Sequence, residues 1–521
     1  MTADSGDTPD GPPSDRAALA WLLAATFLVA VAGLVYELIA ATASSYLLGD
    51  SVRQFSLVIG VFLSSMGLGA WLSRFVGAPV TGFIRAQIAL GLIGGFSAPL
   101  VFATYAGYGV IGLPLYGALI TIGALSGMEI PLLARVLEQI GATAFRFENV
   151  LTFDYLGALV ASVAFPLLIV PHLGLMSASL AFGCLNLAVA GGSLWMFRDR
   201  AGRGTWIAWG IALAVSGAAL VQSERMVSAL DQALYADDII LAEHTPYQAI
   251  TVTRFRDRVR LFLDQSIQFD SRDEHRYHEA LIHPAMVSVA RPRSVLILGG
   301  GDGMAAREVL RHDQVETVTL VDLDPRVTEL FRDRDDLAAL NGGALRDPRV
   351  QVINADAWTW LSAPGPAFDV IIADLPDPRN LALSKLYSRE FYQLMTQRLA
   401  FGGAFVTQAG SPLFARQAFW SIVETLESTP APTAPGNVLE VTPYHVLVPS
   451  FGDWGFALAR PDAAPDRPLA LPEGLRFLTP DAWLAAQIFD KDTDRVEVEL
   501  NSIRTHPLAA YYQQGWDYWF D

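Results

Sequence analysis

The sequence is poor in cysteine, in lysine and in charged residues overall. Its one cysteine, Cys184, lies in an apolar run, which excludes an internal disulfide and a cysteine-based metal site. Only two lysines occur. Charged residues make up 17% of the 521 residues and hydrophobic residues 52%. This balance is too apolar for an ordinary soluble chain, so we expect part of the chain to lie in a membrane.

The charge that is present is mostly negative. The formal net charge of −17 at pH 7 argues against a nucleic-acid partner and favours cationic ligands, although solubility alone explains it equally well. The first residues are acidic and rich in Pro, Gly and Ser, and they lack the basic segment of a secretory signal. We therefore expect residues 1–16 to form a disordered tail.

Residues 17–223 contain apolar segments that are long enough to cross a bilayer, which takes about 20 residues at helical rise. We expect an α-helical bundle in contact with lipid, with seven spans near residues 18–45, 55–76, 84–104, 109–137, 150–171, 176–197 and 204–222. Three carboxylates interrupt these segments, Glu37, Glu129 and Asp154. Carboxylates inside a membrane suggest a pathway or a binding cavity. The alternative is that they pair with polar neighbours and only fix helix packing.

The arginines of the bundle loops bear on its orientation. With seven spans, most of them fall on the side of the N-terminus: Arg74, Arg85, Arg135, Arg146, Arg198, Arg200 and Arg203. The positive-inside rule would then place the chain after residue 223 outside the cytoplasm. A cytosolic reaction of the chain after residue 223 would require the opposite orientation.

After the bundle the apolar runs become shorter and alternate with polar residues. Residues 224–279 predict a linker helix and a small subdomain of antiparallel hairpins. Residues 280–461 alternate strand and helix patterns and end in two adjacent strands, which predicts a doubly wound, Rossmann-like α/β domain. Residues 462–521 predict a helical extension with Trp516 and Trp519 near its end. These aromatic side chains could touch the membrane interface, and docking on the α/β domain is the interpretation we favour.

A glycine-rich turn follows the first strand of the α/β domain, in SVLILGGGDGMAARE. Such a turn lets the backbone approach a nucleotide closely, and a tight turn without a ligand is the alternative. Its glycines are Gly299, Gly300, Gly301 and Gly303. Asp302 among them is unusual for a loop of this kind.

Acidic residues end four successive strands: Asp302, Asp322, Asp356, and Asp374 with Asp377. A single acid at a strand end is commonly a turn or helix-cap residue. Four at one edge of a sheet would repel each other unless a cation lies among them. Asp322 follows the glycines at the distance, about 20 residues, where a carboxylate receives ribose hydroxyls.

In order and spacing, several motifs between about residues 240 and 460 resemble the spermidine synthase family of aminopropyltransferases. They are LDQSIQFDSRDEHRYHE, LILGGGDG, the acid of VDLD, NAD, ADLPDP and SKLYSREFYQLM. A multi-span bundle fused to this domain resembles the membrane-bound bacterial branch of the family. The resemblance implies a multi-pass protein of the bacterial inner membrane with a cytoplasmic catalytic domain, assembled as a homodimer or homotetramer.

The resemblance also implies the substrates. Decarboxylated S-adenosylmethionine would be the co-substrate, and a polyamine, typically putrescine, the acceptor, with spermidine and methylthioadenosine as products. Residues that would contact the donor are Gln248, Asp302 at its ammonium, Asp322 at its ribose, and Asp356 with Ala357 at its adenine. Residues at the acceptor would be Tyr277, His278, Asp377 and Phe451, with Asp374 as the proton acceptor. No prosthetic group is implied, and no metal-ligand spacing of His or Cys occurs.

Physical chemistry favours aminopropyl transfer without the resemblance. A class I methyltransferase has the same sheet, but its donor ends in a carboxylate, which Asp302 would repel. The decarboxylated donor presents only an ammonium there. A polyamine has a reference pKa of about 10.4 and must lose a proton before it attacks, which assigns Asp374 the role of general base. An S-adenosylmethionine-dependent methyltransferase and a non-catalytic polyamine transporter or sensor remain the alternatives.

Some residues depart from the family pattern. Leu375 and Pro376 stand where small hydroxyl residues are usual, and Phe451 stands near a position that is often tyrosine. These changes concern the amine acceptor more than the nucleotide donor. We therefore expect the donor to be that of the family and leave the acceptor open.

Overall fold

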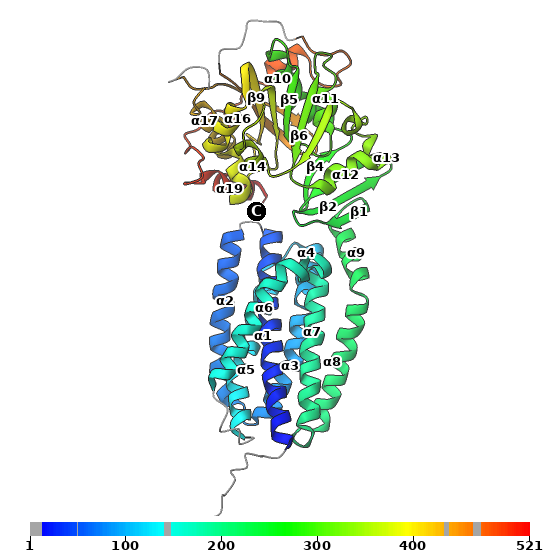
Figure 1. Cartoon of the computed structure of the whole chain (residues 1–521), viewed down its shortest axis with the longest axis vertical. Helices are drawn as coiled ribbons and strands as arrows, with labels where there is room; N and C mark the ends of the chain where they lie inside the picture. Colours follow the sequence, from blue (N-terminus) through cyan, green and yellow to red (C-terminus); the bar gives the residue numbers. More distant parts are fainter. Residues whose placement is uncertain (1–12, 49–50, 140–146, 432–436, 462–469, 521) are drawn as a thin grey trace, which may run out of the picture. The chain divides into compact units, whose positions relative to one another are not determined.

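The computed structural model describes residues 13–48, 51–139, 147–431, 437–461 and 470–520 (Figure 1). The chain divides into two compact units, Met1–Ala236 and Asp237–Asp521. The expected disordered tail lies mostly outside the described residues, and the first helix begins at Pro13.

The first unit consists of helices joined by short loops, and its described residues contain no strand. Its helices are α1 (Pro13–Leu48), α2 (Ser51–Leu72), α3 (Pro79–Gly95), α4 (Ser97–Tyr108), α5 (Gly112–Gln139), α6 (Phe147–Ala164), α7 (Val170–Met196), α8 (Arg203–Val221) and α9 (Ser223–Leu234), with a π-helical turn η2 (Phe165–Ile169) between α6 and α7. Six helical stretches of the described chain are long and apolar enough to cross a membrane. The linker helix α9 is amphipathic, as its sequence indicates.

The sequence predicted seven spans, and the described chain has six helical stretches that could each be a span by length and composition. The difference lies in Glu148–Met196, which forms one stretch of 49 residues where two spans were expected. Gly174 interrupts this stretch, because its φ of 67° and ψ of 172° are not helical. An unbroken helix of this length would measure about 74 Å, more than twice the hydrocarbon thickness of about 30 Å. The break at Gly174 allows the stretch to make two crossings.

Small residues bring the helices of the bundle together. A Cβ atom on Gly69 would lie 1.9 Å from the carbonyl oxygen of Ala124, and one on Gly127 would lie 2.0 Å from that of Met66. These contacts join α2 and α5 backbone to backbone, the geometry that glycine permits between membrane helices. Glu129 is buried, and its Oε1 accepts a hydrogen bond of 2.6 Å from Gln87 Nε2, which joins α5 to α3. For this carboxylate the structure supports a role in helix packing.

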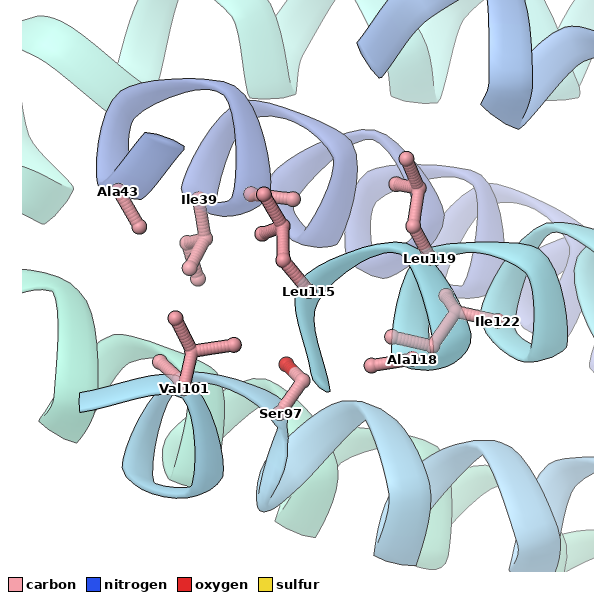
Figure 2. Close-up of a pocket in the computed structure, with 10 residues that line it drawn as sticks. Ile39, Ala43, Ser97, Val101, Leu115, Ala118, Leu119 and Ile122 are labelled. Atoms are coloured by element: carbon pink, nitrogen blue, oxygen red, sulfur yellow. The ribbon is translucent and has the colours of Figure 1, made fainter. Parts of the chain in front are cut away.

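A small cavity lies between α1, α4 and α5 (Figure 2). Its lining is apolar except for the hydroxyl of Ser97, which donates to the backbone oxygen of Gly94. None of the three bundle carboxylates lines this cavity. It therefore offers no charged partner to a polyamine.

The second unit begins with a four-stranded antiparallel sheet in the order β1-β2-β3-β4. Its strands are β1 (Asp238–His244), β2 (Ala249–Phe255), β3 (Arg258–Leu263) and β4 (Ser266–Asp270). Tight turns close the hairpins at residues with left-handed φ, Arg256 and the pair Asp264 and Gln265. The predicted small β subdomain is confirmed, and α10 (Glu274–Ser288) follows it.

A seven-stranded sheet forms the centre of this unit, in the order β10-β11-β9-β8-β5-β6-β7. Its strands are β5 (Ser294–Gly299), β6 (Thr317–Asp322), β7 (Val350–Asn354), β8 (Phe368–Asp374), β9 (Leu399–Gly410), β10 (Glu440–Val448) and β11 (Gly452–Arg460). Strands β5 to β9 are parallel, and β11 and β10 are antiparallel additions at one edge. The predicted Rossmann-like sheet with a modified edge is confirmed.

Helices cover both faces of the large sheet (Figure 1). The helices of this unit are α10, α11 (Met304–Val309), α12 (Pro325–Asp333), α13 (Asp335–Ala338), α14 (Ala357–Ser362), α15 (Leu381–Ser384), α16 (Arg389–Gln397), α17 (Arg416–Glu427), α18 (Pro480–Ala485) and α19 (Pro507–Phe520). Alternate residues of β5 pack into opposite layers, Val295 and Ile297 with α10 and α11, and Leu296 and Leu298 with α16 and α17. A strand buried on both faces explains why β5 is a continuous apolar run.

The C-terminal helix α19 docks on the second unit. Gly515 lies so close to the turn before α17 that a Cβ atom there would be 2.6 Å from the Phe414 oxygen. Trp516 packs on the Phe414 ring, and the Leu508 side chain is fully buried. The favoured interpretation of the C-terminal aromatics, docking on the α/β domain, is confirmed for Trp516.

Candidate active site

The strand order reverses at β5, which has β6 on one side and β8 on the other. In open α/β sheets the crevice at such a reversal, beyond the carboxyl ends of the strands, is the usual ligand site. Here Gly299 ends β5 and pairs in register with Asp374, which ends β8. The glycine loop and the acid predicted to act as a base therefore lie side by side.

The loop after β5 needs glycines because its backbone lies very close to Asp374 and Asp322. Gly299 has a φ of 80°, and a Cβ atom there would lie 2.0 Å from the Asp374 carbonyl oxygen. A Cβ atom on Gly301 would lie 2.6 Å from Asp322 Oδ2, which accepts a hydrogen bond of 3.0 Å from the Gly301 amide. Gly303 also has a left-handed φ, 78°, at the start of α11. The loop is thus held against both Asp374 and Asp322.

Asp302 and Asp322 are acids with raised pKa values. The Asp302 side chain is buried, and its Oδ1 accepts a hydrogen bond of 2.9 Å from the Met304 amide. Burial raises the pKa of Asp302 to about 6, the charge of Asp374 adds to this effect, and the charge of His278 opposes it. Burial likewise raises the pKa of Asp322 to about 6, against hydrogen bonds from the amides of Asp324 and Gly301. A bound cation would lower both pKa values and gain from both charges.

Asp374 is held by a tyrosine. The hydroxyl of Tyr277, on α10, donates to Asp374 Oδ1 at 2.7 Å. Burial raises the pKa of Asp374, while the positive charge of His278 and the Tyr277 hydrogen bond oppose that rise. Phe451 packs edge-on against the Tyr277 ring, with centroids 5.7 Å apart, and against Trp454. These aromatic rings form an apolar wall beside the acid.

His278 is a buried cation beside these acids. Its Nδ1 lies 2.8 Å from Glu274 Oε2, one turn earlier on α10. Burial lowers its pKa, but the hydrogen bond and charge of Glu274, with the charges of Asp302 and Asp374, raise it to about 9. Arg307 in turn contacts Glu274 Oε2 at 2.8 Å. The raised pKa favours the imidazolium form of His278, whose charge acts on both Asp302 and Asp374.

Sequence reasoning did not find Glu274, Arg307 and Glu308. Arg307 bridges Glu274 and Glu308, and Glu308 Oε2 lies 3.2 Å from Nε2 of the fully buried His283. The spacing of Glu274 and His278 by four residues on a helix was an available signal for the first contact. Nothing in the sequence pattern places Arg307 against Glu274, because that contact joins α11 to α10.

Asp377 accepts hydrogen bonds on both carboxylate oxygens. Gln408 Nε2 donates to Oδ1 at 3.1 Å, and the Tyr512 hydroxyl donates to Oδ2 at 2.7 Å. Tyr387 supports the same loop by donating to the backbone oxygen of Pro376 at 3.0 Å. Burial raises the pKa of Asp377, against the hydrogen bonds from Tyr512 and Gln408. Neither Gln408 nor Tyr512 was among the sequence-predicted site residues.

The remaining predicted residues lie at the neighbouring strand ends. Asp356 precedes α14, and its Oδ1 accepts a hydrogen bond of 2.8 Å from the Thr359 amide, so this oxygen has the helix-cap role considered as the alternative. Ala357 is the first residue of that helix, and Lys385 Nζ lies 3.8 Å from Asp356 Oδ2. Gln248 donates to Asp324 Oδ2 at 3.1 Å, so it contacts the acid two residues after Asp322.

The part of the chain that the structure describes contains no cluster of side chains suited to bind a metal ion. Among those residues, no group of three or more His, Cys, Asp or Glu side chains is arranged to hold a metal ion. The acids at the strand ends are instead surrounded by tyrosine hydroxyls, backbone amides and one imidazolium. This environment suits an organic cation better than a bare metal ion.

Comparison with known proteins gives concordant matches. Residues 274–464 match the family described as the spermine/spermidine synthase domain. Polyamine aminopropyltransferase 2 of Ralstonia nicotianae is 45% identical over 509 residues, 95% of this chain and 98% of that protein. The polyamine aminopropyltransferase of Leptospira interrogans is 40% identical over 517 residues, again 95% and 98% of the two chains. A crystal structure of spermidine synthase with the transition-state analogue AdoDATO is 26% identical, covers 49% of this chain and 86% of that one, and has a TM-score of 0.44.

Proposed function

The chain belongs to the polyamine aminopropyltransferase family and is an aminopropyltransferase, and from this premise we propose that it is a membrane-anchored enzyme whose acceptor is a diamine such as putrescine. The observation that carries the proposal is the register of Gly299 with Asp374, which sets the donor loop beside a carboxylate at the strand-order reversal. The products would be spermidine and methylthioadenosine.

The donor is proposed to lie along the carboxyl ends of β5, β6 and β7. Asp302 would face its aminopropyl ammonium, Asp322 its ribose hydroxyls, and Asp356 with the Ala357 amide its adenine. Burial of Asp302 supports this placement, because a buried carboxylate binds an ammonium strongly and repels a carboxylate. Ordinary S-adenosylmethionine, the donor of a methyltransferase, would bring a carboxylate to this point.

The acceptor is proposed to lie between Asp374 and Asp377. Its attacking amine must be neutral, so Asp374 would take one proton from it. The amine nitrogen would then attack the methylene carbon next to the sulfonium, the carbon–sulfur bond would break, and methylthioadenosine would leave with the electron pair. No metal is required, because the sulfonium already carries the charge that makes it a leaving group. Alignment of two bound cations would supply much of the rate enhancement.

One assay tests the reaction and the acceptor together. The full chain, purified in detergent, is incubated with decarboxylated S-adenosylmethionine and a panel of mono-, di- and triamines, and the products are measured by mass spectrometry. We expect methylthioadenosine and a product one aminopropyl group heavier than the diamine. Amine binding without any product would instead support a polyamine transporter or sensor, and methylated products with ordinary S-adenosylmethionine would support a methyltransferase.

The bundle is proposed to anchor the enzyme in the bacterial inner membrane, with the catalytic unit in the cytoplasm, where polyamine chemistry takes place. The arginine distribution argues for the reverse orientation. Arg135 donates to the Ser73 oxygen and Arg200 to Gln139 Oε1, contacts that support a single arginine-rich end of the bundle. An enzyme in this family is also proposed to be a homodimer or homotetramer, which native mass spectrometry would measure.

Cysteine labelling decides the orientation, because the chain has a single natural cysteine. In a Cys184→Ala background, Phe401→Cys places a thiol at a side chain that is 91% exposed on the catalytic unit. A second variant, Arg198→Cys, places one in the exposed loop after α7. With a membrane-impermeant maleimide on spheroplasts, we expect Phe401→Cys to react only after lysis. Labelling of Phe401→Cys in intact spheroplasts would refute the cytoplasmic orientation.

A further inference from the structure

The C-terminal helix α19 contributes a side chain to the acceptor region, although residues 507–520 lie beyond the segment that matches the family domain. We propose that Tyr512 is a positioning residue, which holds Asp377 in place to receive the second ammonium group of a diamine. This inference rests on the proposed acceptor site between Asp374 and Asp377 and assigns it a recognition element from the C-terminal extension.

The hydrogen bonds of Asp377 are the first support. Tyr512 and Gln408 each donate to one of its two oxygens, at 2.7 and 3.1 Å. Both donors are neutral, so they orient the carboxylate without cancelling its charge. The Arg379 side chain donates to Ser266 and pairs with the Asp264 carboxylate at 3.5 Å, and its positive charge also opposes the rise in the pKa of Asp377. A partly buried carboxylate that accepts hydrogen bonds from two neutral donors is suited to a cationic ligand.

The second support is the parallel between the two acids. Asp374 accepts from the Tyr277 hydroxyl at 2.7 Å, and Asp377, three residues later, accepts from the Tyr512 hydroxyl at 2.7 Å. Phe451, which packs against Tyr277, has no hydroxyl to offer. A diamine has two ammonium groups, one to be deprotonated at Asp374 and one to stay charged. Asp377 is the acid available for the charged end.

The third support is the rigidity of α19. The rings of Tyr512 and Trp516 lie 5.9 Å apart, and Trp516 packs on Phe414 at 5.0 Å. Trp519 Nε1 donates to the backbone oxygen of Leu413 at 3.2 Å. Gly515 brings the α19 backbone against the turn that precedes α17. These contacts hold the Tyr512 hydroxyl at a defined position, as a recognition group requires.

A comparison of diamine and monoamine acceptors distinguishes loss of diamine recognition from a general loss of enzyme structure. A monoamine such as butylamine has no second ammonium, so Asp377 has nothing to bind. Loss of the Tyr512 hydroxyl removes a hydrogen bond to a charged group and should weaken binding only of acceptors that use Asp377. A structural role for Tyr512 would instead weaken donor binding and both amine classes together.

The experiment compares Tyr512→Phe with the wild-type full chain, using 1,4-diaminobutane and butylamine. We expect the KM for the diamine to rise about tenfold or more, with kcat at saturation, the KM for the donor and the butylamine rate changed less than about threefold. Tyr511→Phe is the matched control, because the Tyr511 hydroxyl on the same helix accepts from the Glu499 amide and not from the site. Calorimetric binding of methylthioadenosine checks that each variant is folded.

A second variant tests the same role if Tyr512→Phe fails to fold. Asp377→Asn retains both neighbours and removes the charge, and it should show the same diamine-selective rise in KM. Once Asp377 is changed, Tyr512→Phe should add little. An unchanged diamine KM in either variant, or equal losses for diamine and donor, overturns the role of Tyr512. A wild-type chain that forms no product with diamines overturns the proposed acceptor, which is a separate result.

Discussion

Replacement of Asp302 by asparagine tests the electrostatic basis of donor choice. Asparagine keeps the size of the side chain and the oxygen that accepts from the Met304 amide, so the glycine loop should keep its conformation. It removes the negative charge that we assign to the donor's ammonium. The variant should therefore bind the decarboxylated donor more weakly and ordinary S-adenosylmethionine more tightly than the wild type does.

The magnitude follows from burial and charge. Asp302 is 8% exposed, and its pKa of about 6 leaves it ionised at pH 7.5. Two unit charges about 4 Å apart interact by about 4 kcal/mol at an effective dielectric constant of about 20. Ordinary S-adenosylmethionine carries an ammonium on the same carbon as its carboxylate, which offsets part of the repulsion. We expect the ratio of the two donor affinities to change by about 100-fold, or about 2.8 kcal/mol.

Isothermal titration calorimetry with three ligands measures this change. The decarboxylated donor and ordinary S-adenosylmethionine report on the charge of Asp302, and methylthioadenosine, which has no aminopropyl group, is the control. Methylthioadenosine should bind the wild type and Asp302→Asn with the same Kd. The reasoning is refuted if the affinity ratio of the two donors stays within about threefold of the wild-type ratio while methylthioadenosine binding is intact.

Three further predictions concern the same site. Asp374→Asn should lower kcat by about 10²- to 10⁴-fold with little change in donor Kd, because an amide cannot take the amine proton; methylthioadenosine release measures this. The donor kcat/KM should fall as the pH drops through about 6, where Asp302 and Asp322 become protonated and lose their attraction for the donor. Glu274→Gln should move this fall, the acid limb of the pH profile, to higher pH, because His278 loses the partner that raises its pKa to about 9 and so loses the charge that lowers the pKa of Asp302. Loss of the Glu274 charge itself acts in the opposite direction on Asp302, but it is the smaller of the two effects.

These predictions have separate controls. Glu279→Gln alters another buried glutamate of α10, whose oxygens accept from the amides of Arg476, Phe477 and Leu478. It should reduce stability without moving the acid limb. An Asp374→Asn enzyme with more than a tenth of the wild-type kcat would exclude Asp374 as the base, and an acid limb that persists near pH 6 in Asp302→Asn would assign the limb to Asp322.

Local sequence patterns were enough to predict the central part of the site. A glycine loop after a buried strand and an acid at the end of each following strand converge in any parallel sheet, since those ends share one edge. Gly299, Asp302, Asp322 and Asp374 therefore meet as predicted. Their roles toward the donor and acceptor stay predictions. The number of membrane crossings stays a prediction: the hydropathy pattern divides Glu148–Met196 into two spans, and the break at Gly174 lies between them.

The sequence by itself thus determined the fold class of the catalytic unit, its order of strands and helices, and the acids at the strand ends. Those features depend on residue periodicity and on short-range turns. Only the tertiary structure decided what surrounds the acids. Arg307 on α11 contacts Glu274 on α10, and Tyr512 donates to Asp377, which is 135 residues earlier in the sequence. Such contacts depend on how helices pack against the sheet, and packing between distant segments leaves no periodic signal in the sequence.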